Sequence, residues 1–119
     1  MDITKRELKV IALSDENCPF EQWYKGVRDV IARAQIRIRL TRVEGGNFGD
    51  HKIFSGGIGE LRVDVGPGYR VYFVQDGATI VVLLAGGDKS SQSKDIERAR
   101  KLWSDHQNDT QRFQRDFRG

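Results

Sequence analysis

Apolar and polar positions follow strand and helix periodicities along most of this 119-residue chain. In residues 7–14, Leu8, Val10 and Ala12 alternate with other side chains, which predicts a strand. Pro19 suits the first turn of a helix, because the N–H that proline lacks has no intrahelical partner there. The side chains after it recur at helical spacing: Phe20, Trp23, Tyr24 and Val27. A short helix is therefore expected after the first strand.

A second helix is predicted over residues 28–44, with apolar side chains on two nearly opposite stripes. One stripe comprises Val27, Val30, Ile31, Ala34 and Ile38. The other comprises Ala32, Ile36, Leu40 and Val43. Two interpretations are open. A sheet covers one stripe and the first helix covers the other, or part of one stripe stays free for a partner helix.

Glycines end this helix, and short alternating runs with turn residues between them follow. The predicted strands are residues 51–54, 59–65, 69–75 and 79–85. They form an antiparallel meander, with residues 7–14 as a fifth strand. A last helix starts at Ser91 or Ser93 as N-cap. Its inner face comprises Ile96, Ala99, Leu102 and Trp103.

The tail beyond His106 is polar, with Phe113 and Phe117 one helical turn apart, and is interpreted as a frayed extension of the helix. The chain length suits one domain, since compact domains usually hold about 100–150 residues. The expectation is a single α+β domain over residues 1–119, with 1–6 and 108–119 as flexible tails.

Cysteine and hydropathy patterns bear on location. Cys18 is the only cysteine, so no internal disulfide can form, and a reducing compartment is expected. The longest apolar run, residues 79–87, is much shorter than the roughly 20 residues of a membrane span. The first residues lack the apolar core of a secretory signal. The sequence therefore predicts a cytoplasmic protein without a membrane partner.

Basic residues concentrate in one segment although the whole chain carries only +3, from 20 Lys and Arg against 17 Asp and Glu. Residues 25–42 hold six basic residues and one acid, and Arg33 and Arg37 lie in the predicted helix. Arginine binds phosphate with two parallel hydrogen bonds. The segment is either a phosphate-binding surface or a solvated helix face.

Hairpin register brings further basic residues together. A three-residue loop at 66–68 would pair Arg62 with Tyr72 and Asp64 with Arg70. A loop at 55–57 sets Lys52 opposite Glu60. A two-residue loop at 76–77 would pair Arg70 with Leu83, which brings Lys89 beside Arg70. The side chains expected on one polar face are Lys52, Arg62, Arg70, Tyr72 and Lys89.

Two interpretations of this polar face are open. Lys52 with Glu60 and Asp64 with Arg70 could be ordinary cross-strand ion pairs. Alternatively the excess of cations over acids matches a phosphate chain. His51 and His106 are too few for a metal cluster, so no metal and no cofactor are predicted.

Several motifs, taken together, carry a resemblance to a known family. They are residues 47–52 (Asn-Phe-Gly-Asp-His-Lys), 60–62 (Glu-Leu-Arg), 66–73 (Gly-Pro-Gly-Tyr-Arg-Val-Tyr-Phe), 86–92 (Gly-Gly-Asp-Lys-Ser-Ser-Gln) and 95–96 (Asp-Ile). Together they resemble the bacterial RelE/ParE toxin superfamily, and more narrowly its HigB-like addiction module killer protein branch. The resemblance implies a small α/β sandwich. In it, an antiparallel sheet of four or five strands carries two N-terminal helices and a C-terminal helix.

The resemblance also implies a function, the toxin of a type II toxin–antitoxin pair. Many relatives cut messenger RNA on the ribosome without a metal. The implied partners are a cognate antitoxin, expected to be a helix-turn-helix protein, and mRNA with the ribosome. The implied catalytic residues are Arg62, Arg70, Lys89 and Lys52. Tyr72, Arg37 and Arg33 are expected to bind RNA.

In the expected reaction the RNA 2′-OH attacks the neighbouring phosphate, and Arg62 and Arg70 stabilise the charge that develops. Lys89 or Lys52 acts as the general acid or the general base, and Glu60 is the alternative general base. Tyr72 stacks on a nucleobase of the RNA or donates a proton. Residues 92–95 hold no tyrosine, although the archetypal nuclease uses one near the start of its last helix. Two alternatives stay open: a ParE-like, non-enzymatic inhibitor of DNA gyrase, and an inactive relative that only binds an antitoxin.

Overall fold

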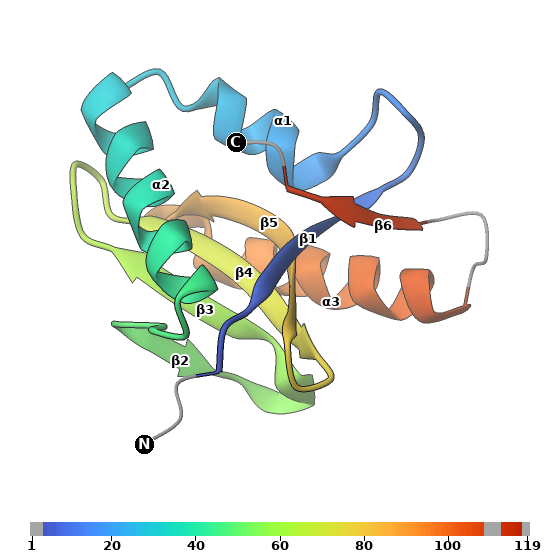
Figure 1. The fold of residues 1–119 in the computed structure, drawn as a ribbon. Helices are drawn as coiled ribbons and strands as arrows, with labels where there is room; N and C mark the ends of the chain where they lie inside the picture. Colours follow the sequence, from blue (N-terminus) through green and yellow to red (C-terminus); the bar gives the residue numbers. More distant parts are fainter. Residues whose placement is uncertain (1–3, 109–112, 118–119) are drawn as a thin grey trace.

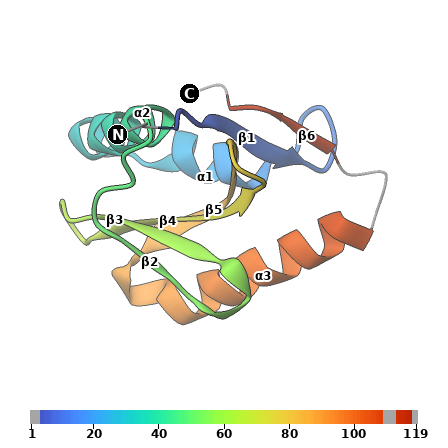
Figure 2. The same cartoon turned by 60° about the horizontal axis from the view of Figure 1, so that its bottom comes forward.

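A computed structural model describes residues 4–108 and 113–117 as one sheet with helices on both faces. Figure 1 shows three helices, α1 (Pro19–Gly26), α2 (Val30–Glu44) and α3 (Gln92–Asn108). The strands are β1 (Glu7–Ala12), β2 (His51–Ile53), β3 (Gly59–Val63), β4 (Tyr69–Asp76), β5 (Ile80–Asp88) and β6 (Phe113–Asp116). Figure 2 shows α1 and α2 on one side of the β2–β5 meander and α3 on the other. The mixed α+β class is as predicted.

The strand order in the sheet is β2-β3-β4-β5-β1-β6. Strands β2 to β5 form the expected antiparallel meander. The expectation of an entirely antiparallel sheet is wrong, because β1 pairs with β5 in parallel. The chain leaves β1 through α1 and α2, crosses one face and enters the sheet again at the far edge, in β2.

The C-terminal segment corrects the expectation of a frayed, flexible helix extension. Residues Phe113–Asp116 form strand β6, antiparallel to β1, with Lys9 opposite Asp116 and Ala12 opposite Phe113. The Phe117 ring packs on Phe20 and Tyr24 of α1, each at 5.6 Å between ring centroids. Phe113 and Phe117, whose spacing of four residues suggested a helix, therefore lie in the paired strand β6 and directly after it. The rest of the two predicted tails lies partly outside the described residues.

Helix α2 buries one of its two apolar stripes. Its buried side chains are Ala32, Ile36, Leu40 and Val43. In the other stripe, Val30 is 67% exposed and Ile31 is 74% exposed. Helix α1 therefore does not cover this stripe, although Val27 in the preceding loop is buried. Part of this stripe is therefore exposed, as the second interpretation predicted, and the partner helix stays a prediction.

Helix α3 covers the opposite sheet face with the predicted side chains Ile96, Ala99, Leu102 and Trp103. Ser91 directly precedes the first residue of the helix, and its hydroxyl donates to the Asp88 carbonyl and to Asp95 Oδ2, whereas Ser93 lies inside the helix. The chain turns through a short 3-10 helix at Lys89–Ser91, where the Asp88 carboxylate accepts hydrogen bonds from the backbone N–H and the hydroxyl of Ser90. This contact lowers the pKa of Asp88. Helix α3 consequently starts at Gln92.

The observed register differs from the predicted one in two hairpins. Arg62 lies opposite Arg70, and Glu60 opposite Tyr72, because the β3–β4 loop has five residues instead of three. Arg70 lies opposite Gly87, not Leu83, for two reasons. The β4–β5 loop has three residues, 77–79, instead of two, and β5 holds one extra residue, Leu84, between the pairs Phe73–Leu83 and Tyr72–Ala85. The pairing of Lys52 with Glu60 is as predicted.

Candidate functional site

A polar cluster occupies the sheet face where α3 begins. We call it the Glu60 cluster, and it comprises Glu60, Arg62, Arg70, Tyr72 and Gln92. Strands β3 and β4 supply its first four members, and the first residue of α3 supplies Gln92. The period-two alternation of the strands places Glu60 and Arg62 on one face, while Leu61 and Val63 join the core on the other.

The Glu60 carboxylate is fully buried and is the centre of the cluster. Its Oε1 accepts a hydrogen bond from Nε of Arg62 at 3.0 Å and lies 4.0 Å from Nε of Arg70. Its Oε2 accepts from the Tyr72 hydroxyl at 3.0 Å and from Nε2 of Gln92 at 2.8 Å. Both oxygens are thus engaged by groups from three elements.

The two arginines differ in exposure. Arg70 is buried, and its Nη1 donates to Asp64 Oδ1 at 3.2 Å and to the Tyr69 carbonyl at 3.0 Å. The Arg62 side chain is 33% exposed, and its hydrogen bond to Glu60 raises its pKa. Within the described residues, neither terminal nitrogen of Arg62 has a hydrogen-bond partner. These nitrogens are available to a ligand.

Arg39 of α2 holds the backbone around Arg62. Arg39 was not predicted from the sequence as a site residue. Its guanidinium donates to the carbonyl of Arg62, to that of Phe48 at 2.8 Å and to that of Asp50 at 2.9 Å. Burial lowers the pKa of Arg39. Arg39 therefore ties the loop before β2 to β3, and its role is structural.

Tyr72 is fully buried and presents no ring surface on which a base could stack in this structure. Burial, followed by the nearby negative charge of Glu60, raises the pKa of its hydroxyl. The hydroxyl consequently stays protonated at neutral pH and serves as a donor to Glu60. This arrangement gives Tyr72 a place in the cluster without direct contact to solvent.

The predicted lysines lie on either side of the cluster. Lys89 is exposed, and its backbone N–H donates to the Gly68 carbonyl at 2.7 Å, which holds it against the loop before Arg70. Lys52 lies opposite Glu60 on edge strand β2, and its ammonium lies 5.0 Å from the centre of the Phe54 ring. Lys89 is near Arg70 as expected, although through a different register.

Arg33 and Arg37 do not belong to this group. They lie on α2, which packs on the opposite face of the sheet. Nη1 of Arg33 donates to the Val27 carbonyl at 3.2 Å, and the Arg37 guanidinium lies 5.3 Å from the centre of the Phe117 ring. The structure therefore separates these two predicted RNA-binding residues from Arg62 and Arg70.

Gln92 belongs to the Glu60 cluster, although the sequence did not predict it as a site residue and showed it only within the 86–92 motif. It reaches Glu60 because the start of α3 lies close against β5 at Gly87. A side chain at Gly87 would place its Cβ 1.8 Å from Asp95 Oδ2. Asp95 is buried and accepts a hydrogen bond from the Ser91 hydroxyl at 2.5 Å. Glycine at this position thus leaves room for the Asp95 carboxylate at the start of α3.

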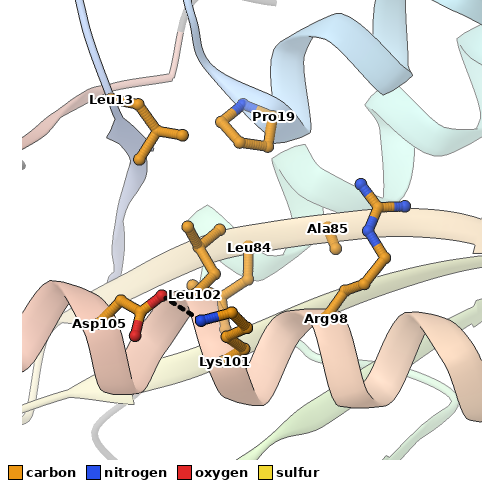
Figure 3. A pocket seen from close by; sticks show the side chains of 8 residues that line it. All are labelled: Leu13, Pro19, Leu84, Ala85, Arg98, Lys101, Leu102 and Asp105. Carbon is orange, nitrogen blue, oxygen red and sulfur yellow. Dashed lines mark hydrogen bonds and ion pairs between the residues drawn. The ribbon is translucent and has the colours of Figure 1, made fainter.

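A separate pocket of about 260 Å³ lies between α3, β5 and the segment that connects β1 to α1 (Figure 3). Its apolar lining includes Leu13, Leu84 and Leu102, and Lys101 and Asp105 form an ion pair of 3.0 Å at its rim. No member of the Glu60 cluster lines it. This pocket and the cluster are therefore distinct places on the molecule.

Within residues 4–108 and 113–117, no three His, Cys, Asp or Glu side chains are grouped so that they could hold a metal ion. None of the helices in this described part is both long enough and apolar enough to cross a bilayer.

Comparison with known proteins gives one informative relative. An uncharacterized protein of Haemophilus influenzae is 47% identical over 83 residues, which make up 70% of this chain and 84% of that protein. The chain belongs to the same family as that protein. No family model matches the chain, and no solved structure matches it.

Proposed function

We propose that this protein is the toxin of a type II toxin–antitoxin module, with the RelE-like sandwich fold of the HigB-like branch of the RelE/ParE superfamily. Its activity is metal-independent cleavage of messenger RNA on the ribosome, which inhibits translation. The observation that carries the proposal is the Glu60 cluster, in which two arginines on adjacent strands are held at one carboxylate beside Lys89. The proposed setting is the cytoplasm, and the proposed protein partner is a helix-turn-helix antitoxin.

The cluster suits phosphoryl chemistry. Attack of the RNA 2′-OH on its neighbouring phosphate places negative charge on the non-bridging oxygens in the transition state. Fixed guanidinium groups stabilise such charge without reorganisation. Arg62 offers its two terminal nitrogens, and Arg70 adds a second, buried positive charge. Lys89 and Lys52, both exposed at the rim, remain the proposed proton donor and acceptor.

Induced expression followed by primer extension on cellular transcripts tests the proposal. The wild-type protein is expected to arrest growth and to produce new transcript 5′ ends. Arg62→Ala and Arg70→Ala should each reduce cleavage about 100-fold or more, the usual effect of losing one transition-state donor. Arg100→Ala is the matched control, because Arg100 pairs with Glu97 on the surface of α3. Circular dichroism verifies that each variant is folded. Intact transcripts during growth arrest would contradict the proposal.

One observation favours a second candidate, a non-enzymatic inhibitor that binds a large partner such as DNA gyrase. The Val30 and Ile31 side chains project from α2 into solvent, as an apolar contact surface would. In that case Ile31→Asp should abolish growth arrest while Arg62→Ala leaves it unchanged, and transcripts stay intact. If the protein is an inactive relative that only binds an antitoxin, neither the wild type nor the variants would arrest growth.

A further inference from the structure

The register of the sheet creates an electrostatic conflict that Glu60 resolves. Arg62 and Arg70 lie directly opposite each other on β3 and β4. Like charges at such a cross-strand position repel and destabilise the pair. The buried Glu60 carboxylate lies within 4.0 Å of the Nε atoms of both arginines. A single negative charge thus allows two positive charges to share one site.

The same contacts argue against Glu60 as a base. A general base needs a free oxygen within hydrogen-bond reach of the substrate hydroxyl. Both Glu60 oxygens already accept hydrogen bonds, and the side chain has no exposed surface. Substrate could not reach Glu60 without displacing Arg62, Tyr72 or Gln92.

Tyr72 and Gln92 add a second function to the carboxylate. They donate to Oε2 from β4 and from the start of α3, so the carboxylate is held from the side away from Arg62. Burying an acid with several donors is favourable only when the geometry satisfies each of them. The carboxylate so held accepts the hydrogen bond of Arg62 and faces Arg70 at 4.0 Å, and Arg70 is also held by Asp64 and the Tyr69 carbonyl.

We infer that Glu60 is a positioning residue that holds Arg62 and Arg70 in the orientation that binds one phosphodiester group of single-stranded RNA. The inference rests on the proposed function for its substrate. Arg62 contacts Glu60 through Nε, which leaves its two terminal nitrogens for the phosphate oxygens. Such binding reads the RNA backbone and not the bases.

A spectroscopic experiment tests the positioning part by itself. In the wild-type protein the Arg62 Nε–H should give a slowly exchanging ¹H–¹⁵N signal, because it is bonded to a buried carboxylate. Glu60→Gln should shift that signal and accelerate its exchange. Glu97→Gln, which alters the surface pair of Glu97 with Arg100, is the matched control and should leave the signal unchanged. An unchanged Arg62 signal in Glu60→Gln would overturn the inference, whether or not the protein cleaves RNA.

A kinetic cycle tests the link to catalysis. Cleavage of mRNA is measured in a translation reaction with ribosomes. Glu60→Gln should lower the rate about 100-fold in the wild-type background, comparable to losing a transition-state donor. In the Arg62→Ala background the same change should cost about tenfold or less, because coupled residues are not additive. An equal loss in both backgrounds would identify Glu60 as acting independently of Arg62, as a base would, and would overturn the inference.

Two further measurements keep the outcomes separate. If Glu60→Gln fails to fold, Gln92→Ala and Tyr72→Phe each remove one of the two donors to Oε2 while keeping all charges, and each should also accelerate exchange at Arg62 Nε–H. No acceleration in either variant would overturn the inference.

A binding measurement uses a 2′-deoxy-substituted oligonucleotide, which cannot be cleaved. Its affinity for the wild-type protein should be at least about tenfold higher than its affinity for Glu60→Gln, as expected for a disturbed charged contact. If the wild-type protein cleaves no mRNA but the exchange result holds, the proposed nuclease activity fails and the positioning role does not.

Discussion

Two buried carboxylates, on opposite faces of the sheet, bind arginines in different ways. Glu21 of α1 binds both terminal nitrogens of Arg115 on β6, at 2.5 and 3.1 Å. Glu60 of β3 instead binds Arg62 through Nε. The first arrangement uses the terminal nitrogens of its arginine to connect two elements of the fold. The second leaves them free, so it is suited to bind something else. Which nitrogen is engaged distinguishes a structural pair from a candidate site.

The largest expected difference in stability concerns the arginine partners. Arg115→Ala should lower the free energy of unfolding by about 1.5–3 kcal/mol, since it removes the guanidinium that hydrogen-bonds the Glu21 carboxylate. Arg62→Ala should leave the urea midpoint close to that of the wild type, because Glu60 keeps Tyr72 and Gln92. Urea denaturation followed by circular dichroism measures both. A larger loss for Arg62→Ala than for Arg115→Ala would contradict the comparison.

A smaller effect is expected where α3 meets the sheet. Gly87→Ala would place a Cβ 1.8 Å from Asp95 Oδ2, so the Asp95 carboxylate, and with it the first turn of α3, is expected to shift. Overpacking of this kind costs about 1–3 kcal/mol. Because Gln92 moves with that turn, mRNA cleavage should also fall.

Gly26→Ala is the matched control for this prediction, since a Cβ there would meet nothing within 4 Å. Urea denaturation gives the stability, and primer extension gives the cleavage. Wild-type cleavage in a destabilised Gly87→Ala protein would show that the Glu60 cluster does not depend on the position of α3.

The smallest effect concerns Cys18, which lies beside Glu21 and serves as a reporter of that region. Burial, with a further contribution from the Glu21 charge, raises the pKa of the thiol. Less thiolate is therefore present at pH 8 than in the unfolded chain, and alkylation by iodoacetamide should be slower in the native protein. Mass spectrometry follows the labelling.

Labelling of Cys18 also distinguishes loss of the arginine at Glu21 from loss of the arginine at Glu60. Arg62→Ala, on the other sheet face, should leave the labelling rate unchanged. Arg115→Ala should accelerate labelling through local opening of α1 and β6. Equal rates in native and urea-unfolded protein would show that Cys18 is not protected by the fold.

The faces of β3 and β4 could be predicted from the sequence because the register error in their hairpin was small and even. The β3–β4 loop is two residues longer than expected, and a shift of two residues leaves every side chain on its predicted face. Arg62, Arg70 and Tyr72 therefore came together as expected, although their partners changed. The prediction for β5 was wrong, because its hairpin with β4 is shifted by three residues and Leu83 lies in the core instead of beside Arg70. The bulge at Leu84 could not be foreseen, because no turn residue marks it.

Contacts that depend on where a helix starts were beyond sequence reasoning. Gln92 meets Glu60 only because a 3-10 turn precedes α3 and Gly87 permits close approach. Strand β6 was missed for a related reason: its four residues show no clear alternation, and its pairing with β1 is a contact across more than 100 residues. Local periodicity carries no information about such a partner.

The central position of β1 has a consequence for the order of folding during synthesis. Strands β2 to β5 are neighbours in the chain and can pair soon after each is made. Strand β1 precedes the other strands in the chain and has to wait for β5, and β6 can add only after α3 has been made. Because contacts distant in sequence form slowly, β1 and β6 are expected to join the sheet after the β2–β5 meander has paired. Until then the β1 edge stays open, and the Glu21–Arg115 pair cannot form.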